Sequence, residues 1–389
     1  MQGSVFSTGP CRQFSRQLGQ GVVLDAASQS NQPSGYIVKR IVICLITVAL
    51  SWTAAAAELS RISVKGNQFV AADGKPIVFR AIDTSDPDKL QRNDQWNKRY
   101  FDEMKAWGAN IVRFPVHPSA WRIHGKENYI KLLDQGVAWA RELDLYVIID
   151  WHSIGNIEAQ KFLPGGSELY PVKIYETTKK ETLDFWRTMS KHYGGNNTVA
   201  FFELFNEPVV GGKMGDCTWA QWKEFMEEVI VEIRKNGGTA VPLVAGFDYA
   251  YDLKPVAADP IKAEGIGYVS HPYPMKVKQP WEEPWTRDWG FVAEKYPLFL
   301  TEFGFLTPEE PGGYNPIIGD ETYGKALMDY CAKRGISYGV WVFDPHWTPQ
   351  MIKDWEFTPT RQGAFFKKVM QASQKNPAVA STPEKAGGQ

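Results

Sequence analysis

Short runs of apolar residues alternate along the chain with longer segments whose apolar residues recur at helical spacing. The runs have the length and lack of charge that strands buried on both faces show. They predict eight strands at residues 77–82, 110–116, 146–152, 201–207, 242–247, 266–273, 298–304 and 338–344. The helical patterns predict helices at residues 94–107, 129–143, 174–193, 219–235, 252–258, 287–294, 321–334 and 362–372. Eight strand and helix units in succession indicate an α/β fold, a closed (β/α)8 TIM barrel.

The pattern also suggests how the domain begins and ends. Residues 62–69 and 74–76 predict a small N-terminal β-hairpin at the bottom of the barrel. A glycine-rich phosphate loop does not follow the first strand, which argues against an open dinucleotide-binding sheet. We expect residues 58–376 to form a single (β/α)8 catalytic domain and residues 377–389, rich in Pro, Ala, Ser and Gly, to be a disordered tail.

The first 57 residues have the character of a leader. Lys39 and Arg40 precede an apolar run at residues 41–50, and small residues follow before Glu58. This order is typical of an export signal, and the run is too short to span a bilayer comfortably. The pattern predicts cleavage near Ala57, and a true translation start at Val38 would explain the patternless residues ahead of the signal. We therefore expect an exported protein, secreted or periplasmic, with no membrane segment after cleavage.

The composition limits the classes of molecule that the protein is expected to bind. The net charge is −1 with 22% charged residues, which favours neither nucleic acid nor an anionic membrane. Aromatic residues reach 13%, more than one core needs, and this fits a surface that stacks on sugar rings. Cys217 and Cys331 are the cysteines outside the leader, too few for a disulfide framework. We expect a monomer with no cofactor and no metal.

Two acids stand where a buried strand would normally avoid charge. Glu207 ends the run at residues 201–207, and Glu302 lies near the end of the run at residues 298–304. Active sites of this barrel lie at the C-terminal ends of the strands, so both acids would face one site. Glycoside hydrolysis requires such a pair, one protonated and one ionised, about 5 Å apart in retaining enzymes. Either acid alone could instead be a strand-end residue bonded to backbone or solvent.

Other polar residues cluster at the same strand ends. They are Arg113, Asp150, His152, His271 and Tyr273. A metal-dependent hydrolase using Asp150, His152 and His271 is an alternative, but a His-x-His pair and a bridging-lysine signature are missing from the sequence. Side-chain alternation points Glu203 into the barrel interior, where we expect an ion pair with Arg80 or Arg113.

These motifs together resemble glycoside hydrolase family 5. The matching residues are Arg113 in Arg-Phe-Pro, His152 after Asp-Trp, Asn206-Glu207-Pro208, His271-Pro-Tyr273, Glu302-Phe-Gly304 and Trp341, in order over most of the chain. The resemblance implies a retaining β-glycanase of the cellulase kind, an endo-β-1,4-glucanase acting on β-glucan by double displacement. β-Mannanase, xyloglucanase, transglycosylase and a catalytically inactive carbohydrate-binding barrel remain alternatives, because fold does not decide substrate.

The resemblance also implies roles for individual residues. Glu207 would be the general acid and base, and Glu302 the nucleophile. Asn206 would bond the sugar 2-hydroxyl, Tyr273 and Arg113 would support Glu302, His152 and His271 would orient hydroxyls or the acid, and Trp341 would be the platform under the sugar that is cleaved.

Several loop residues extend this expectation. Trp121, Trp151 and Trp347 are candidate sugar platforms, together with Trp281 and Trp285, and His117 and His346 lie in loops that could touch sugar. The segment after the first strand departs from the glycine-valine-asparagine turn of many family members. Its acids, Asp83 and Asp86, would lie near the non-reducing side of the cleft, which leaves the sugar preference of that end open.

Overall fold

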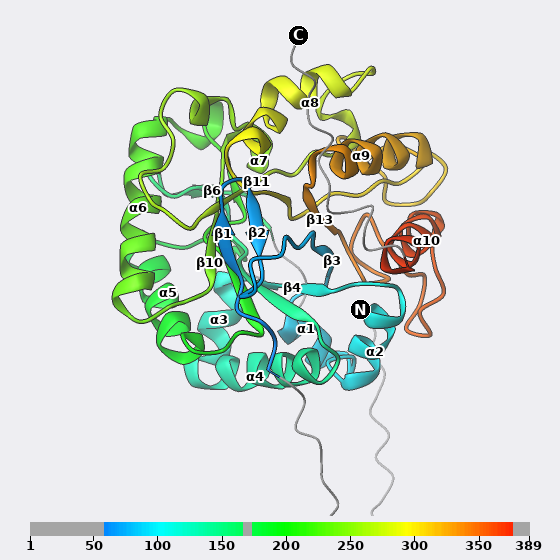
Figure 1. Cartoon of the computed structure of the whole chain (residues 1–389), viewed down its shortest axis with the longest axis horizontal. Helices are drawn as coiled ribbons and strands as arrows, with labels where there is room; N and C mark the ends of the chain where they lie inside the picture. The colour runs from blue at the N-terminus through cyan, green and yellow to red at the C-terminus, as the bar shows by residue number, and fades with distance from the viewer. Residues whose placement is uncertain (1–57, 166–172, 376–389) are drawn as a thin grey trace, which may run out of the picture. The chain divides into compact units, whose positions relative to one another are not determined.

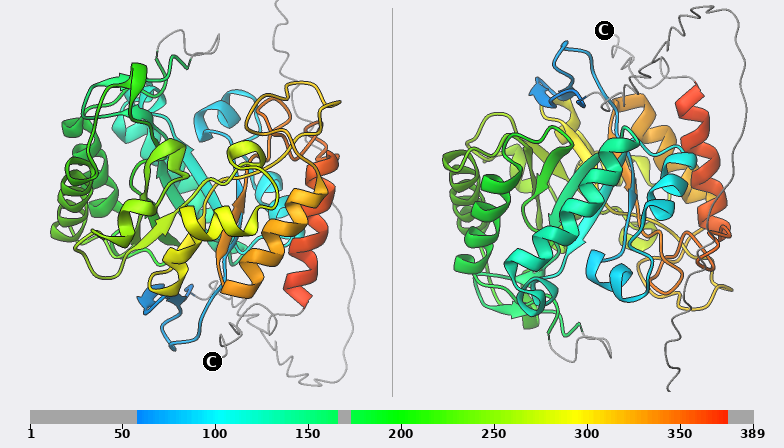
Figure 2. Two further views of the ribbon diagram at one scale, coloured as in Figure 1. Left: turned by 90° about the horizontal axis from the view of Figure 1, so that it is seen from above. Right: turned by 90° about the horizontal axis from the view of Figure 1, so that it is seen from below.

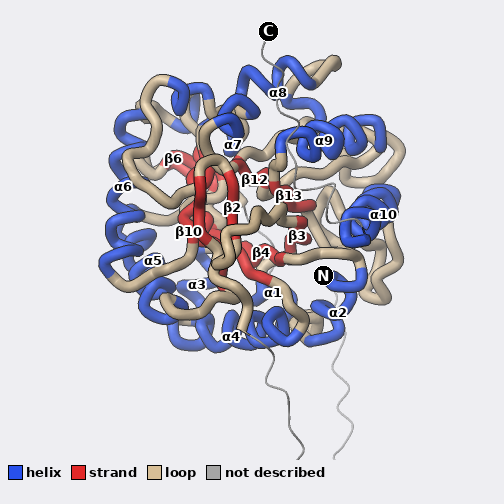
Figure 3. The backbone as a smooth tube through the Cα atoms, in the orientation of Figure 1, coloured by secondary structure: helices blue, strands red, loops and turns tan. Residues whose placement is uncertain are grey.

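Eight parallel strands close into a barrel in the computed structural model, which describes residues 58–165 and 173–375 (Figure 1). Around the barrel the order is β3 (Arg80–Asp83), β4 (Ile111–Val116), β5 (Tyr146–Trp151), β8 (Val199–Glu203), β10 (Val241–Ala245), β11 (Gly267–Val269), β12 (Leu298–Leu300) and β13 (Ser337–Val340), which pairs again with β3. Figure 3 shows these strands enclosed by helices. The predicted (β/α)8 fold is confirmed.

The helices that follow the strands have the amphipathic character the sequence predicts. The α-helices are α1 (Pro87–Arg92), α2 (Lys98–Ala106), α3 (Pro118–His124), α4 (Lys126–Glu142), α5 (Lys179–Tyr193), α6 (Trp219–Lys235), α8 (Glu282–Asp288), α9 (Glu321–Arg334) and α10 (Arg361–Lys375). The segment α7 (Phe247–Ala250) is a left-handed turn. Short 3-10 turns are η1 (Gly212–Met214), η2 (Lys254–Ala257), η3 (Pro274–Lys276) and η4 (Gly290–Glu294). Thr218 and Gln221 form a capping box at the start of α6, so side chains satisfy the free N–H groups there.

Some helix predictions were wrong in their bounds. The helix expected at residues 94–107 is α2 alone, which begins at Lys98, since Asp94 has a left-handed backbone (φ 56°). Helix α1 ends before that range and was not predicted. The segment at residues 252–258 contains only the short turn η2, and α8 begins earlier than the pattern at residues 287–294 indicated. Helix α3 was not predicted. Cys217 and Cys331 are free thiols, as expected.

The fourth predicted strand is divided between the barrel and a small second sheet. That sheet consists of β6 (Ile154–Asn156), β7 (Lys161–Phe162) and β9 (Glu207–Pro208). The run expected at residues 201–207 ends as a barrel strand at Glu203, and Glu207 pairs with Ile154 of β6 instead of a barrel strand. The backbone N–H of Glu207 donates to the Ser153 carbonyl at 3.0 Å. The chain therefore leaves the barrel wall just before its acid.

A hairpin of β1 (Ser63–Lys65) and β2 (Gln68–Val70) lies at one end of the barrel (Figure 2). The prediction of a bottom hairpin is confirmed, but its pairing was wrong, because Gly66, with φ 60°, turns the chain within the first expected arm. The expected pairing of residues 62–69 with residues 74–76 is represented only by an isolated β-bridge between Val70 and Pro76 in the described residues. Phe69 packs its ring 4.9 Å from that of Phe201. The hairpin thus closes the lower core.

The predicted leader at residues 1–57 and the tail at residues 377–389 lie outside the described residues. Within residues 58–165 and 173–375, no helix combines the length and apolar character needed to cross a bilayer.

Candidate active site

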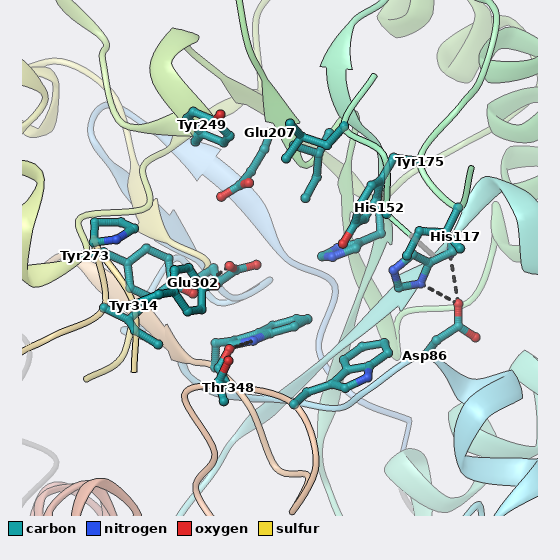
Figure 4. Close-up of a pocket in the computed structure, with 18 of the residues that line it drawn as sticks. Asp86, His117, His152, Tyr175, Glu207, Tyr249, Tyr273, Glu302, Tyr314 and Thr348 are labelled. Carbon is teal, nitrogen blue, oxygen red and sulfur yellow. Dashed lines mark hydrogen bonds and ion pairs between the residues drawn. The ribbon is translucent and has the colours of Figure 1, made fainter. Parts of the chain in front are cut away.

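Glu207 and Glu302 face each other in a cleft of about 700 Å³ at the C-terminal ends of the strands (Figure 4). Glu207 follows β8, and Glu302 lies two residues after β12. Each is 7% exposed. A carboxylate oxygen of one lies within 4.8 Å of a carboxylate oxygen of the other, and both oxygens lie within 4.8 Å of a ring nitrogen of His271. The structure therefore brings the two predicted acids together.

Two donors hold the Glu302 carboxyl group. The Tyr273 hydroxyl donates to Oε1 at 2.7 Å, and Nη1 of Arg113 donates to Oε2 at 3.4 Å. Burial raises the pKa of Glu302 above its ordinary value, and the Glu207 charge adds to this rise, whereas His271, Arg113 and Tyr273 act to lower it. Burial and the Glu302 charge hold the pKa of Tyr273 well above its ordinary value, so its hydroxyl keeps the proton that it donates.

His271 links Glu207 to the barrel interior. Its Nδ1 lies 3.0 Å from Oε1 of Glu207, and its Nε2 lies 3.0 Å from Oγ1 of Thr301, which donates to Glu203 at 2.8 Å. Burial would lower the pKa of His271, but Glu302, Glu203 and Glu207 together raise it to about 10. Protonated His271 can donate to Glu207 and Thr301 at once.

Arg113 is the central cation beneath the carboxyl pair. It is completely buried, and its Nε and Nη2 donate to Glu203 at 2.7 and 3.1 Å. The predicted ion pair of Glu203 is thus with Arg113. The alternative prediction, an ion pair between Glu203 and Arg80, was wrong, because Nε of Arg80 donates to the Gly108 carbonyl. Burial acts to raise the pKa of Glu203, but Arg113 and His271 outweigh it and lower the value to about 2.

Asn206 and Asp150 also contact Nη2 of Arg113, the nitrogen that donates to Glu203. Nη2 donates to Oδ1 of Asn206 at 2.7 Å and lies 3.0 Å from Oδ2 of Asp150. Asn206 is fully buried, and its Nδ2 has no hydrogen-bond partner among the described residues. Oδ2 of Asp150 also lies 2.6 Å from Nδ1 of His152. Asp150 therefore already serves two partners, which weakens the metal-ligand reading of Asp150, His152 and His271.

Trp341 and Trp347 form the aromatic floor of the cleft. Their ring centroids are 5.8 Å apart and the rings are inclined by 17°. His152 lies parallel to Trp341 at 5.4 Å, and burial holds the pKa of His152 well below its ordinary value. The ring of His117 lies 5.5 Å from that of Trp347. The structure therefore places two indole faces side by side in the cleft.

Asp83, the last residue of β3, and Asp86, three residues later, occupy different positions. Asp86 lines the cleft and accepts from the backbone N–H of His117 at 3.0 Å and from the Tyr129 hydroxyl at 2.7 Å. Asp83 does not line the cleft. It is buried beside Arg113, at 3.6 Å, and burial raises its pKa well above the ordinary value. Of this pair, only Asp86 can meet a ligand in the cleft.

The other tryptophan predictions were wrong. Trp121 packs against Phe185 at 5.0 Å, and Trp151 stacks on the same ring at 4.2 Å, so both belong to the core and neither lines the cleft. Trp281 and Trp285 stack on each other at 5.9 Å, also outside the cleft. Apolar spacing alone could not separate loop platforms from core residues.

Three tyrosines in the cleft were missed. Tyr175, Tyr249 and Tyr314 line it together with His117 and His346, whose contact with the cleft was expected. Two of the tyrosines lie in segments that follow barrel strands, Tyr249 in the turn after β10 and Tyr314 in the long segment between β12 and α9. The criterion used for the tryptophans, an aromatic residue in a loop after a strand, would have found them.

Fold and site together define the class of protein: a (β/α)8 barrel with a close carboxyl pair of the kind that retaining glycosidases use. The model of the cellulase family, glycosyl hydrolase family 5, matches residues 70–346. The chain belongs to this family.

Individual relatives agree with the family assignment. Endoglucanase A of Butyrivibrio fibrisolvens is 27% identical over 293 residues, which are 72% of this chain and 59% of the relative. The chain thus spans less than two thirds of that protein. A β-glucanase from Saccharophagus degradans, also solved in complex with cellotetraose, is 44% identical with a TM-score of 0.78. That likeness covers 81% of this chain and 94% of the β-glucanase chain. An endoglucanase from Thermobifida fusca, 20% identical with a TM-score of 0.64, shares the fold.

Proposed function

We propose that the protein hydrolyses β-linked glucan with retention of configuration, using Glu207 as acid and base and Glu302 as nucleophile. The observation that carries the proposal is the approach of the two carboxyl groups to within 4.8 Å. Retaining glycosidases hold their carboxyl groups about 5–5.5 Å apart, whereas inverting enzymes leave about 6.5–9.5 Å for a water molecule.

The donors around each carboxyl group support the division of roles. Glu302 accepts from Arg113 and Tyr273, and both contacts stabilise an anion ready to attack. Glu207 has His271 as its side-chain partner, and among the described residues it has no arginine contact. Because Arg113 lies against Glu302 and not against Glu207 among the described residues, we assign the nucleophile to Glu302 and the acid and base to Glu207.

In the first step the Glu302 carboxylate attacks the anomeric carbon and the glycosidic C–O bond breaks. Glu207 gives its proton to the departing oxygen, so the leaving sugar departs as a neutral alcohol. In the second step a water molecule attacks the same carbon while Glu207 takes a proton from that water. The bond between the carbon and Glu302 then breaks. The product keeps the β configuration, and both acids return to their starting states.

The surrounding residues orient the sugar. The unpaired Nδ2 of Asn206 would donate to the 2-hydroxyl, while Arg113 fixes the amide through its oxygen. Trp341 would lie under the sugar that is cleaved and Trp347 under its neighbour on the non-reducing side. Neutral His152, held by Asp150, would bond a hydroxyl of the cleaved sugar.

The relatives favour a β-1,4-linked glucan. The β-glucanase at 44% identity was solved with cellotetraose, and several relatives are endoglucanases. Mannan, xyloglucan and transfer to another sugar remain alternatives on the same fold, since the carboxyl pair does not select the sugar.

The test is release of reducing sugar from a panel of carboxymethyl cellulose, mixed-linkage glucan, xyloglucan and mannan. Glu207→Ala and Glu302→Ala should each lose at least about 10³-fold in kcat/KM, since each removes a group that acts in the transition state. Azide should rescue both variants, yielding the β-azide from the Glu207 variant and the α-azide from the Glu302 variant. Full activity in either variant would overturn the assignment.

We also propose that the protein is exported, on the strength of the charged and apolar segment at residues 39–57. N-terminal sequencing of the protein from a culture medium or periplasm should find a start near Glu58. A mature chain that retains Ser28 or Gln32 would contradict this.

A further inference from the structure

The turn after β10 has an unusual backbone. Asp248 (φ 57°, ψ 54°) and Tyr249 (φ 58°, ψ 53°) are left-handed, and Ala250 also has a φ of 58°. The segment labelled α7 is therefore not a right-handed helix. Each residue with a β-carbon is disfavoured in this region, so three in succession persist only where their surroundings hold them.

Hydrogen bonds fix the turn at its two ends. Phe247 and Asp252 exchange backbone bonds of 3.1 and 2.9 Å. The backbone N–H of His271 donates to the Ala250 carbonyl at 3.2 Å. The turn is thereby joined to the segment that carries the histidine partner of Glu207.

Lys276 holds the middle of the turn. Its side chain is 11% exposed, and Nζ donates to the Asp248 carbonyl at 2.8 Å and lies 3.2 Å from the Asp248 carboxylate. The same ammonium lies 4.7 Å from the centroid of the Tyr249 ring, within the range of a cation–π contact. Lys276 ends η3, three residues after Tyr273. It therefore connects the loop that supports Glu302 with the turn that carries Tyr249.

Tyr249 stands beside the proposed acid. It lines the cleft on the side of Glu207, and both side chains point into the pocket in Figure 4. The turn packs against β9, which contains Glu207. Burial raises the pKa of the Tyr249 hydroxyl, and the charge of Glu207 adds to this rise, so the hydroxyl remains a donor. The sugar that leaves with a proton from Glu207 must depart on this side.

We propose that Lys276 is a positioning residue that holds Tyr249 against the sugar leaving group, and so makes the enzyme selective for substrates whose leaving group is a sugar. The proposal rests on the proposed function. The ammonium lies over the Tyr249 ring, and both residues line the cleft, so the ring is held in place at the cleft wall where a hexose would contact it. Lys276 also lines the cleft, and the proposal assigns its effect to its contact with Tyr249.

The test compares Lys276→Met with the native enzyme on two substrates. Cellotetraose has a sugar leaving group, whereas β-cellobiosyl fluoride releases fluoride, which has no ring for Tyr249 to contact. The ratio of kcat/KM for cellotetraose to kcat/KM for the fluoride should fall about tenfold, within the range of a partly desolvated cation–π contact. Methionine keeps most of the lysine stem, so packing changes little.

Two further variants keep the proposal falsifiable. Tyr249→Ala should lower the same ratio at least as far, and adding Lys276→Met to it should cause no further fall. Lys278→Met is the matched control, an exposed lysine two residues away that does not line the cleft, and it should leave the ratio unchanged.

An unchanged ratio in Lys276→Met, or an additive loss in the double variant, would overturn the proposal. A native enzyme that cleaves the fluoride but no glucan would refute the proposed glucan substrate instead, which separates the two failures.

Discussion

The two ends of the barrel interior are filled by different kinds of side chain, apolar rings at the lower end and charged groups at the upper end. At the lower end the rings of Phe69, Phe79, Phe201 and Phe299 meet with centroids 4.9–6.2 Å apart. At the upper end completely buried Arg113 lies among carboxylates, including Glu203 at 2.7 Å. Phe201 and Glu203 lie two residues apart on β8 and therefore on the same face. One strand thus supplies both the apolar plug and the charged network.

This difference between the two ends indicates where the protein tolerates substitutions. Apolar contact is not directional, so a smaller ring at the lower end costs buried area and leaves a void. The upper network depends on each partner, because removing one leaves the others buried with uncompensated charge or unmade hydrogen bonds. Only the upper end should couple stability to catalysis.

Arg113→Met should give the largest effect. Loss of the cation leaves Glu203, Asp150 and Glu302 without their common partner, and breaking a buried ion pair costs roughly 3–5 kcal/mol of unfolding free energy. Activity should fall in parallel, since Glu302 loses a donor. Urea unfolding followed by tryptophan fluorescence measures the first effect and kcat/KM the second. Arg99→Met, which removes an exposed partner of Glu356, is the control. An equal loss of stability in both variants would contradict the special role of the buried charged network.

Phe201→Ala tests the lower end. A large cavity among three neighbouring rings should cost about 3–5 kcal/mol, while Phe201→Leu should cost less because it refills part of the volume. Below its melting temperature the alanine variant should retain the native kcat/KM and pH profile. A shifted pH profile would show that the lower end also influences the charges.

Thr301→Val should have a smaller effect. Valine keeps the shape but removes the hydroxyl that donates to Glu203 and meets Nε2 of His271. A buried acceptor left without its donor costs about 1–3 kcal/mol. Thr307→Val, at a hydroxyl that donates to Glu310, serves as a comparison, and denaturant midpoints decide between them. Stability loss no larger than in the comparison variant would mean that the Thr301 link is unimportant.

The last prediction concerns the dependence of stability on pH. The pKa of His271 is raised from 6.5 to about 10, so the folded state keeps a proton that the unfolded chain releases above pH 6.5. Its stabilisation is complete below that pH and is lost as pH rises towards 10, by about 1.4 kcal/mol per pH unit at most. His271→Asn should flatten the fall in unfolding free energy between pH 7 and 10. An unchanged slope would contradict a protonated His271.

The sequence predicted the barrel because its strands are continuous buried runs, and it predicted the carboxyl pair because Glu207 and Glu302 interrupt such runs. It also predicted that Glu203 faces the interior. It did not predict the break between β8 and β9, because hydrogen bonds to the chain after β5 cause that break, and these form between segments far apart in sequence.

Side chains in loops were predicted least well. Trp151 looks like a platform in the sequence, but it fills a core space against Phe185. The same loop criterion would have marked Tyr249 as a candidate, but its placement depends on a left-handed turn held by Lys276, a residue from another loop. In such cases the position of a ring is decided by tertiary contacts, which the local pattern does not contain.

The most direct test of the central claim is mass spectrometry of the enzyme trapped with a 2-deoxy-2-fluoro-β-cellobioside that carries a good leaving group. Peptide mapping should find one fluorosugar attached to Glu302, because that carboxylate forms the covalent intermediate in a retaining mechanism. Attachment to Glu207, or a hydrolytic product of inverted configuration with no trapped sugar, would contradict the account.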